Sequence, residues 1–394
     1  MHSQPPAVVM GNLMMGRCFT LENIPYIGIT TKNDKRLFYS KACLAGYALE
    51  NPSVNEEATL EGLIRIGREY GPGLPLFYTN DAQLKLVNRH ADVLHEWFVF
   101  TMPEKRLIDA SLDKHLFDSL AAEYHLPVPP TFHKDDVSDP DALDYPVIIK
   151  PTSRIHWFQS SVIKELGSQQ KILLVEDAAA FKRYKEKIDR ENIDYIVQKY
   201  VRGSEAQILS FHGFYDEHSE PLGYYCGRKI RTYPYDYGLS CSLTLIEHEA
   251  MTRISLDILK RLNFKGPIKI DYKLDEQSGE LYLLELNPRY NMWHYIGARA
   301  GINLPALAWR YLAEGRRSEV QTVYETGIKW ISGFQELLTF RDMKKHGLIS
   351  TSEWLRSLSG HRIYQTYAPD DLKPVVYAAW DTFKGGVRKI RKIF

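Results

Sequence analysis

Apolar and polar positions alternate in short blocks over the first hundred residues. Apolar runs at residues 7–10, 26–30 and 76–79 are separated by stretches of helical periodicity, the longest of which covers residues 56–70. Strands alternating with helices predict a small doubly wound α/β domain with a parallel sheet, whose ligands usually meet the carboxyl ends of the strands. Gly11 and Gly16 do not form a GxGxxG motif, so dinucleotide binding has little support.

The pattern changes after this region. An amphipathic helix over residues 113–125 ends at the proline-rich stretch 126–130, and an apolar strand over 146–151 carries Lys150 near its end. A further strand over 194–201 precedes long antiparallel strands to about residue 247 and a helix over 249–262 with a repeating apolar face. The change from parallel α/β to antiparallel α+β character predicts a domain boundary. A chain of 394 residues is also too long for one ordinary hydrophobic core, which indicates two or three domains.

Two strands on either side of Ser278 carry an unusual set of polar side chains. The first covers residues 268–274, and the second ends in residues 284–289. Side chains alternate between the faces of a strand, so Glu285 and Asn287 point the same way, and a turn centred on Ser278 places Asp271 opposite Glu285. Facing carboxylates repel each other unless a positive charge lies between them, and an oxygen-only ligand set suits Mg²⁺ or Mn²⁺.

The hairpin alone leaves a second interpretation open. Lys269 and Lys273 lie on the same strand as Asp271, and their ammonium groups could neutralise a solvated hairpin edge that binds no metal.

Composition adds limits to this picture. Hydrophobic residues make up 44% of the chain and charged residues 25%, which is typical of a globular protein. The 50 Lys and Arg nearly balance the 49 Asp and Glu, so we expect no nucleic-acid partner. Four cysteines without CxxC spacing indicate free thiols in a reducing compartment. No apolar run is long enough for a membrane span and no signal peptide is evident, so we expect a cytoplasmic protein.

The last thirteen residues, 382–394, depart from this balance. They contain five basic residues and no acidic one, interspersed with apolar side chains. Such a segment can lie on an anionic membrane surface, which would place the protein at the inner face of the membrane. The alternative is a solvated last helix whose positive charges favour its C-terminal end.

Four motifs follow one another along the chain: Asp113–Lys114, PVIIKP, QKYVRGSE and IDYKLDEQSGELYLLELNPR. Taken in this order, they resemble the ATP-grasp superfamily, in the branch of carboxylate–amine ligases similar to D-aspartate ligase and to carbamoyl-phosphate-synthetase-type domains. The resemblance extends from the N-terminal α/β domain to about Trp309. It implies a pre-ATP-grasp domain over residues 1–110, a first ATP-grasp lobe over 111–200, a second lobe over 201–315 with the antiparallel sheet and metal site, and a C-terminal extension over 316–394.

The resemblance also implies roles for individual residues. Lys114 and Lys150 would contact the α- and β-phosphates of ATP, and Glu205 would accept hydrogen bonds from both ribose hydroxyls. The hinge that binds the adenine ring would be Gln198, Lys199, Tyr200 and Val201. Asp271, Glu285 and Asn287 match the positions that bind Mg²⁺ or Mn²⁺. Arg289 would face the transferred phosphoryl group, where a planar guanidinium suits an oxyanion.

A second basic cluster lies in the antiparallel lobe. Alternation along the predicted strand puts Lys229 and Arg231 on one face, where they would hold the γ-phosphate or an acyl phosphate. A solvated strand face is the alternative.

The chain departs from the family pattern in one loop. Residues 151–171, where many relatives have a glycine-rich lid, contain only Gly167, and they carry Ser153, Arg154, His156, Trp157, Ser160 and Ser161. Whether this loop covers ATP stays open. Trp293 and His294 lie where acceptor-side residues are expected, although a histidine among aromatic residues is more often a packed core residue.

The chemistry that the resemblance implies is activation of a carboxylate by ATP. A carboxylate would take the γ-phosphate to give an acyl phosphate and ADP, and an amine would then displace the phosphate. Two alternatives are an ATP-grasp enzyme with a thiol or hydroxyl acceptor, and a non-catalytic ATP-binding scaffold. A scaffold has no need of Asp271, Glu285 and Asn287 together, so their presence favours an enzyme.

Overall fold

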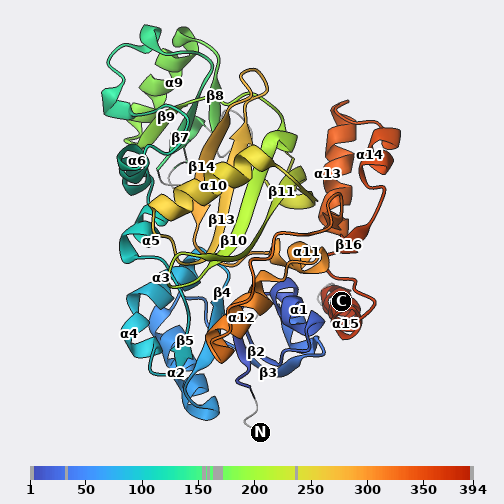
Figure 1. The fold of residues 1–394 in the computed structure, drawn as a ribbon. Helices are drawn as coiled ribbons and strands as arrows, with labels where there is room; N and C mark the ends of the chain where they lie inside the picture. The colour runs from blue at the N-terminus through green and yellow to red at the C-terminus, as the bar shows by residue number, and fades with distance from the viewer. Residues whose placement is uncertain are drawn as a thin grey trace.

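The structure is a computed structural model that describes residues 4–31, 34–152, 157, 160–162, 172–235 and 238–390, with side chains up to residue 382. Its described residues form three β-sheets, which Figure 1 shows from the N-terminal sheet at the bottom to the smallest sheet at the upper left.

The N-terminal sheet is parallel, as the sequence predicts. Its strands lie in the order β3 (Cys43–Ala48), β2 (Tyr26–Thr30), β1 (Ala7–Met10), β4 (Leu74–Tyr78) and β5 (Phe98–Val99). Both faces are buried because the strands are apolar at successive positions: Ala7 and Val9 belong to one hydrophobic core, and Val8 and Met10 to another.

Helices cover both faces of this sheet. α1 (Leu13–Leu21) packs on the first face, and Asn12 caps it by accepting hydrogen bonds from the N–H groups of Met14 and Met15. The second face packs against α2 (Glu56–Tyr70), α3 (Asp81–Arg89) and part of α5 (Lys105–Leu112). The short elements α4 (Ala91–Leu94) and the 3₁₀ helix η1 (Arg36–Tyr39) complete this region.

A four-stranded antiparallel sheet forms the lobe at the top of Figure 1. Its strands lie in the order β6 (Thr131–His133), β9 (Tyr195–Lys199), β7 (Val147–Pro151) and β8 (Leu173–Val175). They pack against α9 (Ala178–Arg190), and the 3₁₀ turns η2 (Lys134–Asp136) and η3 (Pro140–Ala142) lie at the margin. This lobe has a separate hydrophobic core that contains only residues between 137 and 197.

The third sheet has seven strands and occupies the centre of the molecule. Their order is β14 (Leu281–Asn287), β13 (Gly266–Leu274), β10 (Ile208–Tyr215), β11 (Pro221–Tyr233), β12 (Leu239–Ile246), β15 (Lys329–Ile331) and β16 (Arg362–Tyr364). Every neighbouring pair is antiparallel except β15 and β16. The predicted antiparallel region is therefore confirmed, and it gains two strands from the C-terminal part of the chain.

Each face of the central sheet shares a core with another part of the molecule. α10 (Glu249–Arg261) crosses one face, where α5 and α6 (Lys114–Glu123) join the same core. On the other face, α11 (His294–Arg299) and α12 (Leu304–Glu314) lie between the sheet and α1. The N-terminal sheet and the central sheet are therefore joined by one continuous hydrophobic core.

Three further helices follow the central sheet. α13 (Gly333–Lys345) and α14 (Thr351–Ser357) stand together at one end of it, and α15 (Lys373–Ile390) lies beside the N-terminal domain. A buried ion pair of 3.2 Å between Arg17 and Asp371 precedes α15, and the rings of Tyr39 and Tyr377 stack at 4.1 Å. The side chains of the predicted basic tail beyond Thr382 lie outside the described residues.

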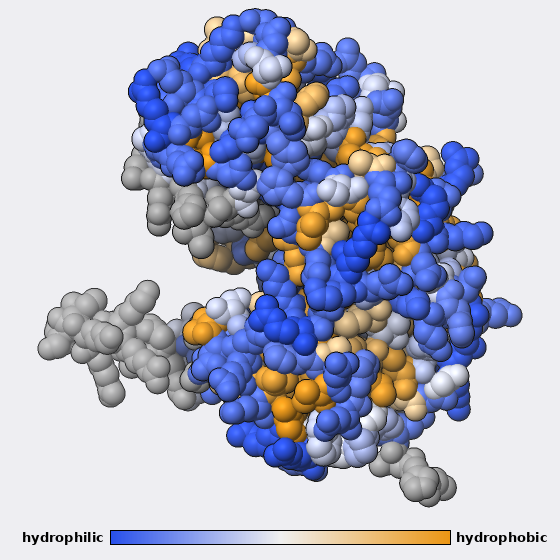
Figure 2. All heavy atoms as spheres, turned by 90° about the vertical axis from the view of Figure 1, so that its left-hand side faces the viewer, coloured by the Kyte–Doolittle hydropathy of each residue, from blue (hydrophilic) through white to orange (hydrophobic). Residues whose placement is uncertain are grey.

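The surface is hollowed between the upper lobe and the rest of the molecule (Figure 2). Among the described residues, no helix combines the length and the apolar character needed to span a bilayer.

Candidate active site

The two strands around Ser278 form the predicted hairpin at one edge of the central sheet. Asp271 of β13 lies opposite Glu285 of β14, and Lys269 lies opposite Asn287. The Nδ2 atom of Asn287 donates hydrogen bonds to Glu285 Oε1 at 3.0 Å and to Asp271 Oδ2 at 3.5 Å. The sequence-based prediction that these three side chains meet on one face is therefore confirmed.

Asp271 is a buried carboxylate with one unsatisfied oxygen. Its Oδ2 atom accepts a hydrogen bond of 2.6 Å from the Lys269 ammonium, while Oδ1 has no hydrogen-bond partner among the described residues. Burial alone would raise the pKa of Asp271, but the charges of Lys269 and Lys229 lower it below its usual value. The alternative interpretation, a solvated hairpin edge neutralised by lysine, therefore holds in part. Lys269 does neutralise Asp271, but Asp271 is only 3% exposed and so is not solvated.

Glu285 and Asn287 differ from Asp271 in their surroundings. Desolvation, followed by the neighbouring charge of Asp271, raises the pKa of Glu285. Asn287 accepts a hydrogen bond of 3.1 Å from Arg289 Nη2 with its amide oxygen, so its nitrogen faces the carboxylates. No group of three or more His, Cys, Asp or Glu side chains suited to a metal ion occurs within the described ranges, so the metal candidate is this set of two carboxylates and one amide.

Two lysines lie near the hairpin, Lys150 from the upper lobe and Lys114 from α6. The Nζ atom of Lys150, at the end of β7, donates a hydrogen bond of 2.6 Å to Gln198 Oε1 on β9. Desolvation and the neighbouring charge of Lys114 lower the pKa of Lys150 to about 8, against an opposing effect of Glu285. Lys114, at the start of α6, donates to the main-chain oxygen of Pro151. The structure therefore brings both predicted phosphate-binding lysines together, close to the candidate metal ligands.

The predicted hinge covers the end of β9 and the two residues after it. The Gln198 side chain is 8% exposed. Its Nε2 atom donates a hydrogen bond of 2.8 Å to Thr131 Oγ1, and its Oε1 atom accepts the bond from Lys150. The N–H groups of Lys199 and Tyr200 donate to the carbonyls of Pro130 and Pro146, at 2.9 and 3.2 Å. Those two N–H groups are engaged, so an adenine ring would have to bond to other main-chain groups of residues 198–201.

Glu205 lies at the start of the 3₁₀ turn η4 (Glu205–Gln207). Its Oε2 atom accepts a hydrogen bond of 3.0 Å from the main-chain N–H of Thr232. Its Oε1 atom accepts a hydrogen bond from the hydroxyl of Thr232. The sequence offered no signal for Thr232, because its contact with Glu205 depends on how β11 passes η4.

The structure gives Lys229 and Arg231, which the sequence placed together on β11, different partners. Lys229 pairs with Leu243 of β12 and Arg231 with Ser242, and the register shifts on both sides of Arg231 before Thr232 pairs with Ser240. Simple alternation is therefore interrupted over residues 229–232. Lys229 lies near Asp271 and Glu285, and burial lowers the pKa of Lys229. Arg231 instead forms an ion pair with Glu336 of α13, at 2.5 Å and with both side chains buried.

Arg289 lies beyond β14 and joins the hairpin to the N-terminal domain. Its Nε atom donates to Asp81, the first residue of α3, which was not identified from the sequence. Asp81 and Asn80 follow β4, so this contact is at the carboxyl end of a parallel strand, where the sequence pattern placed ligand binding.

His294 is buried, 1% exposed, and neither of its ring nitrogens has a hydrogen-bond partner in the described part of the chain. Burial lowers the pKa of His294 to about 3, so the ring is neutral. It lies edge-on to the ring of His212 at 6.0 Å and to Tyr290 at 5.4 Å. Trp293 stacks on His212 at 5.1 Å and belongs to the core between the central sheet and the N-terminal domain.

The glycine-poor loop is described only in part. Trp157 is fully buried in the core of the upper lobe, and Ser161 donates to Glu191 through its main-chain N–H at 2.9 Å. Ser153, Arg154 and His156 lie outside the described residues.

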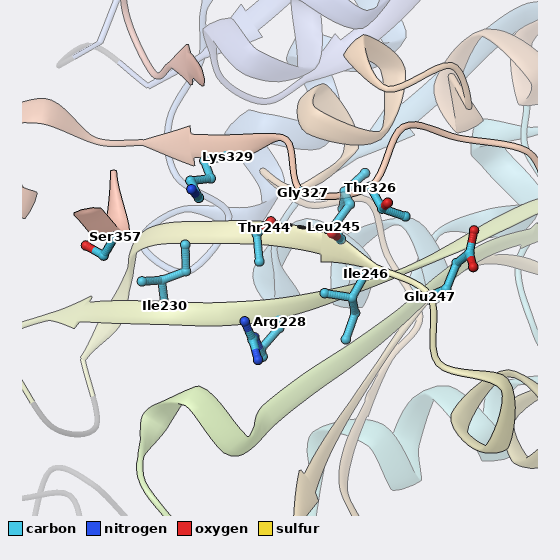
Figure 3. Close-up of a pocket in the computed structure, with 10 residues that line it drawn as sticks. All are labelled: Arg228, Ile230, Thr244, Leu245, Ile246, Glu247, Thr326, Gly327, Lys329 and Ser357. Carbon is cyan, nitrogen blue, oxygen red and sulfur yellow. Dashed lines mark hydrogen bonds between the residues drawn. The ribbon is translucent and has the colours of Figure 1, made fainter. Parts of the chain in front are cut away.

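A cavity of about 550 Å³ lies elsewhere on the central sheet. Figure 3 shows its lining, in which Arg228 of β11, Glu247 and Lys329 of β15 carry the charges. Arg228 and Lys229 are successive strand residues, so this cavity is on the opposite face of β11 from Lys229 and contains none of the predicted site residues.

Known proteins resemble this chain in both sequence and fold. The D-aspartate ligase of Enterococcus faecium is 20% identical over 265 residues, which cover 64% of this chain and 61% of the relative. The N5-carboxyaminoimidazole synthetase of Staphylococcus aureus has a TM-score of 0.60 at 12% identity and covers 87% of this chain and 86% of its own. The L-amino acid ligase of Bacillus licheniformis has a TM-score of 0.57 at 14% identity, with coverages of 81% and 78%. No family model matches the sequence.

The fold and the site together define the class of ATP-grasp ligases as the one that this chain resembles. The resemblance inferred from the motifs is confirmed by relatives of that class in both comparisons. The alignment with the D-aspartate ligase spans less than two thirds of that relative, at 61% of its length, and the likeness to solved structures concerns the fold.

Proposed function

We propose that this protein is an ATP-dependent ligase that phosphorylates a carboxylate and joins it to an amine with release of ADP. The observation that carries the proposal is the hairpin pair Asp271 and Glu285, two carboxylates held face to face with one buried oxygen unsatisfied. Lys150 of the upper lobe and Lys114 of α6 supply cationic side chains to the same place, as phosphate binding requires.

Asp271, Glu285 and Asn287 would hold Mg²⁺ or Mn²⁺. The fit rests on the unpartnered Asp271 Oδ1 and on an all-oxygen donor set, which hard cations prefer. The ion would neutralise negative charge that develops on the nucleotide phosphates. Coordination by the Asn287 oxygen needs the opposite orientation of the amide, which would release Arg289 Nη2 from its present hydrogen bond.

The remaining site residues would bind and orient the nucleotide. Lys114 and Lys150 would contact the phosphates, residues 198–201 the adenine ring, and Glu205 the ribose. Lys199 lies 5.8 Å above the ring of Tyr282, and Lys273 lies 5.1 Å above the ring of Tyr200. These contacts hold the hinge against the hairpin, which supports a single nucleotide site between the two lobes.

Positioning and charge stabilisation would supply most of the catalysis. The substrate carboxylate would attack the γ-phosphorus of ATP, breaking the bond to ADP and forming an acyl phosphate, and the amine would then displace phosphate. Lys229 and Arg289 would stabilise the oxyanions of these steps, since both lie beside the hairpin. Acyl phosphates hydrolyse, so closure of the two lobes would protect the intermediate from water.

An amino acid or a peptide-like molecule is the substrate class that we propose, because the relative named above is a D-aspartate ligase. Residues 1–110 would serve as the pre-ATP-grasp domain of such an enzyme, and we propose that the reaction takes place in the cytoplasm.

A screen of ADP release over pairs of carboxylates and amines tests the proposal, with mass spectrometry of every active mixture. We expect ADP only when both substrates are present, and a product whose mass equals their sum minus water. An active mixture with a thiol or an alcohol instead of an amine would identify a different acceptor. Nucleotide binding without turnover in any mixture would indicate a scaffold.

A further inference from the structure

We propose that the cavity on the opposite face of β11 from Lys229 is a second ligand site, which binds a small organic phosphate through Arg228 and Lys329. This is the cavity of about 550 Å³ whose lining is drawn in Figure 3. The inference goes beyond the proposed function and does not rest on it, because the cavity contains none of the residues assigned to the nucleotide.

The register of the strands places the two cations in one row across the sheet. Arg228 of β11 pairs with Thr244 of β12, and Thr244 pairs with Lys329 of β15. Paired residues share a face, and the pairing is regular from Cys226 to Lys229. Figure 3 shows Arg228, Thr244 and Lys329 on three neighbouring strands. Two strand spacings separate Arg228 from Lys329, roughly 10 Å between main chains, so their long side chains can reach one anion between them.

A third cation continues the row on the next strand. Lys329 of β15 pairs with Arg362 of β16. Like charges directly opposite each other on neighbouring strands destabilise a sheet. An anion bound beside Lys329 would reduce this repulsion.

The carboxylates around the cavity do not neutralise these cations. Neither Arg228 nor Lys329 forms an ion pair with a residue that the structure describes. Glu247 lines the cavity, but Figure 3 shows it at the opposite end of the lining from Lys329. Glu325, which precedes the lining residue Thr326, lies 2.8 Å from the Nδ1 atom of His361 instead. The positive charge of the row is therefore available to a ligand.

The donors of the two cations suit a phosphate monoester better than a carboxylate. Arg228 presents a planar fork of donors, and Lys329 uses one of its three for the main-chain oxygen of Ser359. A phosphate monoester has three terminal oxygens and a charge of about −1.5 to −2 near pH 7, which matches two cations. A carboxylate has two oxygens and a single charge, so it would leave one cation unmatched.

The rest of the cavity suits the organic part of such a ligand. Ile230, Leu245 and Ile246 contribute apolar groups to the lining. Its volume of about 550 Å³ falls in the range of small-molecule sites and exceeds what a bare phosphate ion fills. Apolar walls also strengthen the attraction between cations and an anion in a cleft. We therefore expect an organic phosphate to bind more tightly than inorganic phosphate.

Calorimetric titration with phenyl phosphate tests the site, because this probe combines one phosphate group with one apolar ring. Arg228→Gln removes the charge at an exposed position and should leave the fold intact. We expect it to weaken phenyl phosphate binding by about 10-fold or more, the effect of losing hydrogen bonds to a charged group. Arg65→Gln, at an equally exposed position on α2, is the matched control and should bind like the wild type.

Lys150→Ala separates this cavity from the proposed nucleotide site. It should keep the wild-type affinity for phenyl phosphate, because Lys150 does not line the cavity. Loss of binding in Lys150→Ala, with retention in Arg228→Gln, would assign the probe to the nucleotide site and overturn the inference.

Three further results would also refute the second site. They are no binding of phenyl phosphate by the wild type, equal affinities of the wild type and Arg228→Gln, and equal affinities of the wild type for phenyl phosphate and inorganic phosphate. Circular dichroism would verify the fold of each variant. Lys329→Gln is the second variant, with the same expected loss, should Arg228→Gln fail to fold.

Discussion

At the scale of single residues, burial and neighbouring charge set the chemistry of the site. Asp271 stays ionised in spite of burial because Lys269 and Lys229 are close, whereas desolvation and Asp271 favour the neutral form of Glu285. The residue types of Asp271, Glu285 and Lys150 could be recognised from the sequence. The partners of Arg289, Glu205 and Arg231 could not be recognised. They are Asp81, Thr232 and Glu336, which carry no local signal in the sequence.

Lys150 leads to a prediction about pH. Its pKa of about 8 in the free protein should rise when nucleotide phosphates bind, because they stabilise the ammonium group. Binding then takes up a proton above pH 8, so we expect the affinity for Mg²⁺–ADP to fall as the pH rises from 7 to 9.5. Calorimetric titrations at several pH values would measure this trend. A Lys150→Arg variant stays charged, so its affinity should change less; equal slopes for both proteins would contradict the assignment.

His294 leads to a prediction about stability. A buried neutral imidazole without partners among the described residues contributes a desolvation cost, so an apolar ring in its place should be nearly neutral. We expect His294→Phe to change the free energy of unfolding by no more than about 1 kcal/mol in urea titrations. A much larger loss would reveal hydrogen bonds that His294 makes in solution.

At the scale of elements, the strands were predicted where side-chain alternation holds and missed where it fails. The pairing of Asp271 with Glu285 agrees with a turn centred on Ser278, although the register shifts by one residue between Asp271 and Tyr272. The irregular pairing on both sides of Arg231 could not be predicted from the same rule, because unpaired strand residues leave no trace in the order of apolar and polar positions. Arg231 forms its ion pair with Glu336 in this irregular stretch.

Close packing on β11 makes Gly227 sensitive to substitution. A Cβ atom at this position would lie 2.6 Å from Trp293 Cζ3 and 3.2 Å from the main-chain oxygen of Thr244. We expect Gly227→Ala to destabilise the protein by about 1–3 kcal/mol in denaturant titrations, because Trp293 is held in the core and must shift. Gly333→Ala is the matched control: it meets no atom within 4 Å, so it should cost no stability. Equal stability of the two variants would argue against this packing.

At the scale of the whole molecule, the hydrophobic cores show which parts are packed together. One core joins the N-terminal sheet to the central sheet, whereas the upper lobe has a core of its own. The sequence indicated the parallel and antiparallel regions through their different periodicities. It could not indicate that α6 packs on the central sheet or that β15 and β16 extend it, since both depend on contacts over long separations in the chain.

The basic tail gives a prediction of its own. Residues 382–394 carry five basic side chains and no acidic one. If they bind anionic membranes, deletion of residues 383–394 should weaken the free energy of binding to phosphatidylserine-containing vesicles by about 1 kcal/mol for each basic residue removed. Co-sedimentation with the vesicles would measure this loss. Neutral vesicles are the control and should bind neither form. Equal binding of the two forms to anionic vesicles would exclude the tail as a membrane contact.

The central claim is that Asp271 and Glu285 form the metal end of an ATP site, and Glu285→Ala tests it most directly. Glu280→Ala, on the same hairpin and exposed like Glu285, is the matched control. The measurement is Mg²⁺-dependent ADP formation by each variant with a substrate pair from the screen, with circular dichroism to verify the fold. We predict a loss of at least about 100-fold for Glu285→Ala and none for Glu280→Ala. Undiminished turnover by a folded Glu285→Ala variant would contradict the account.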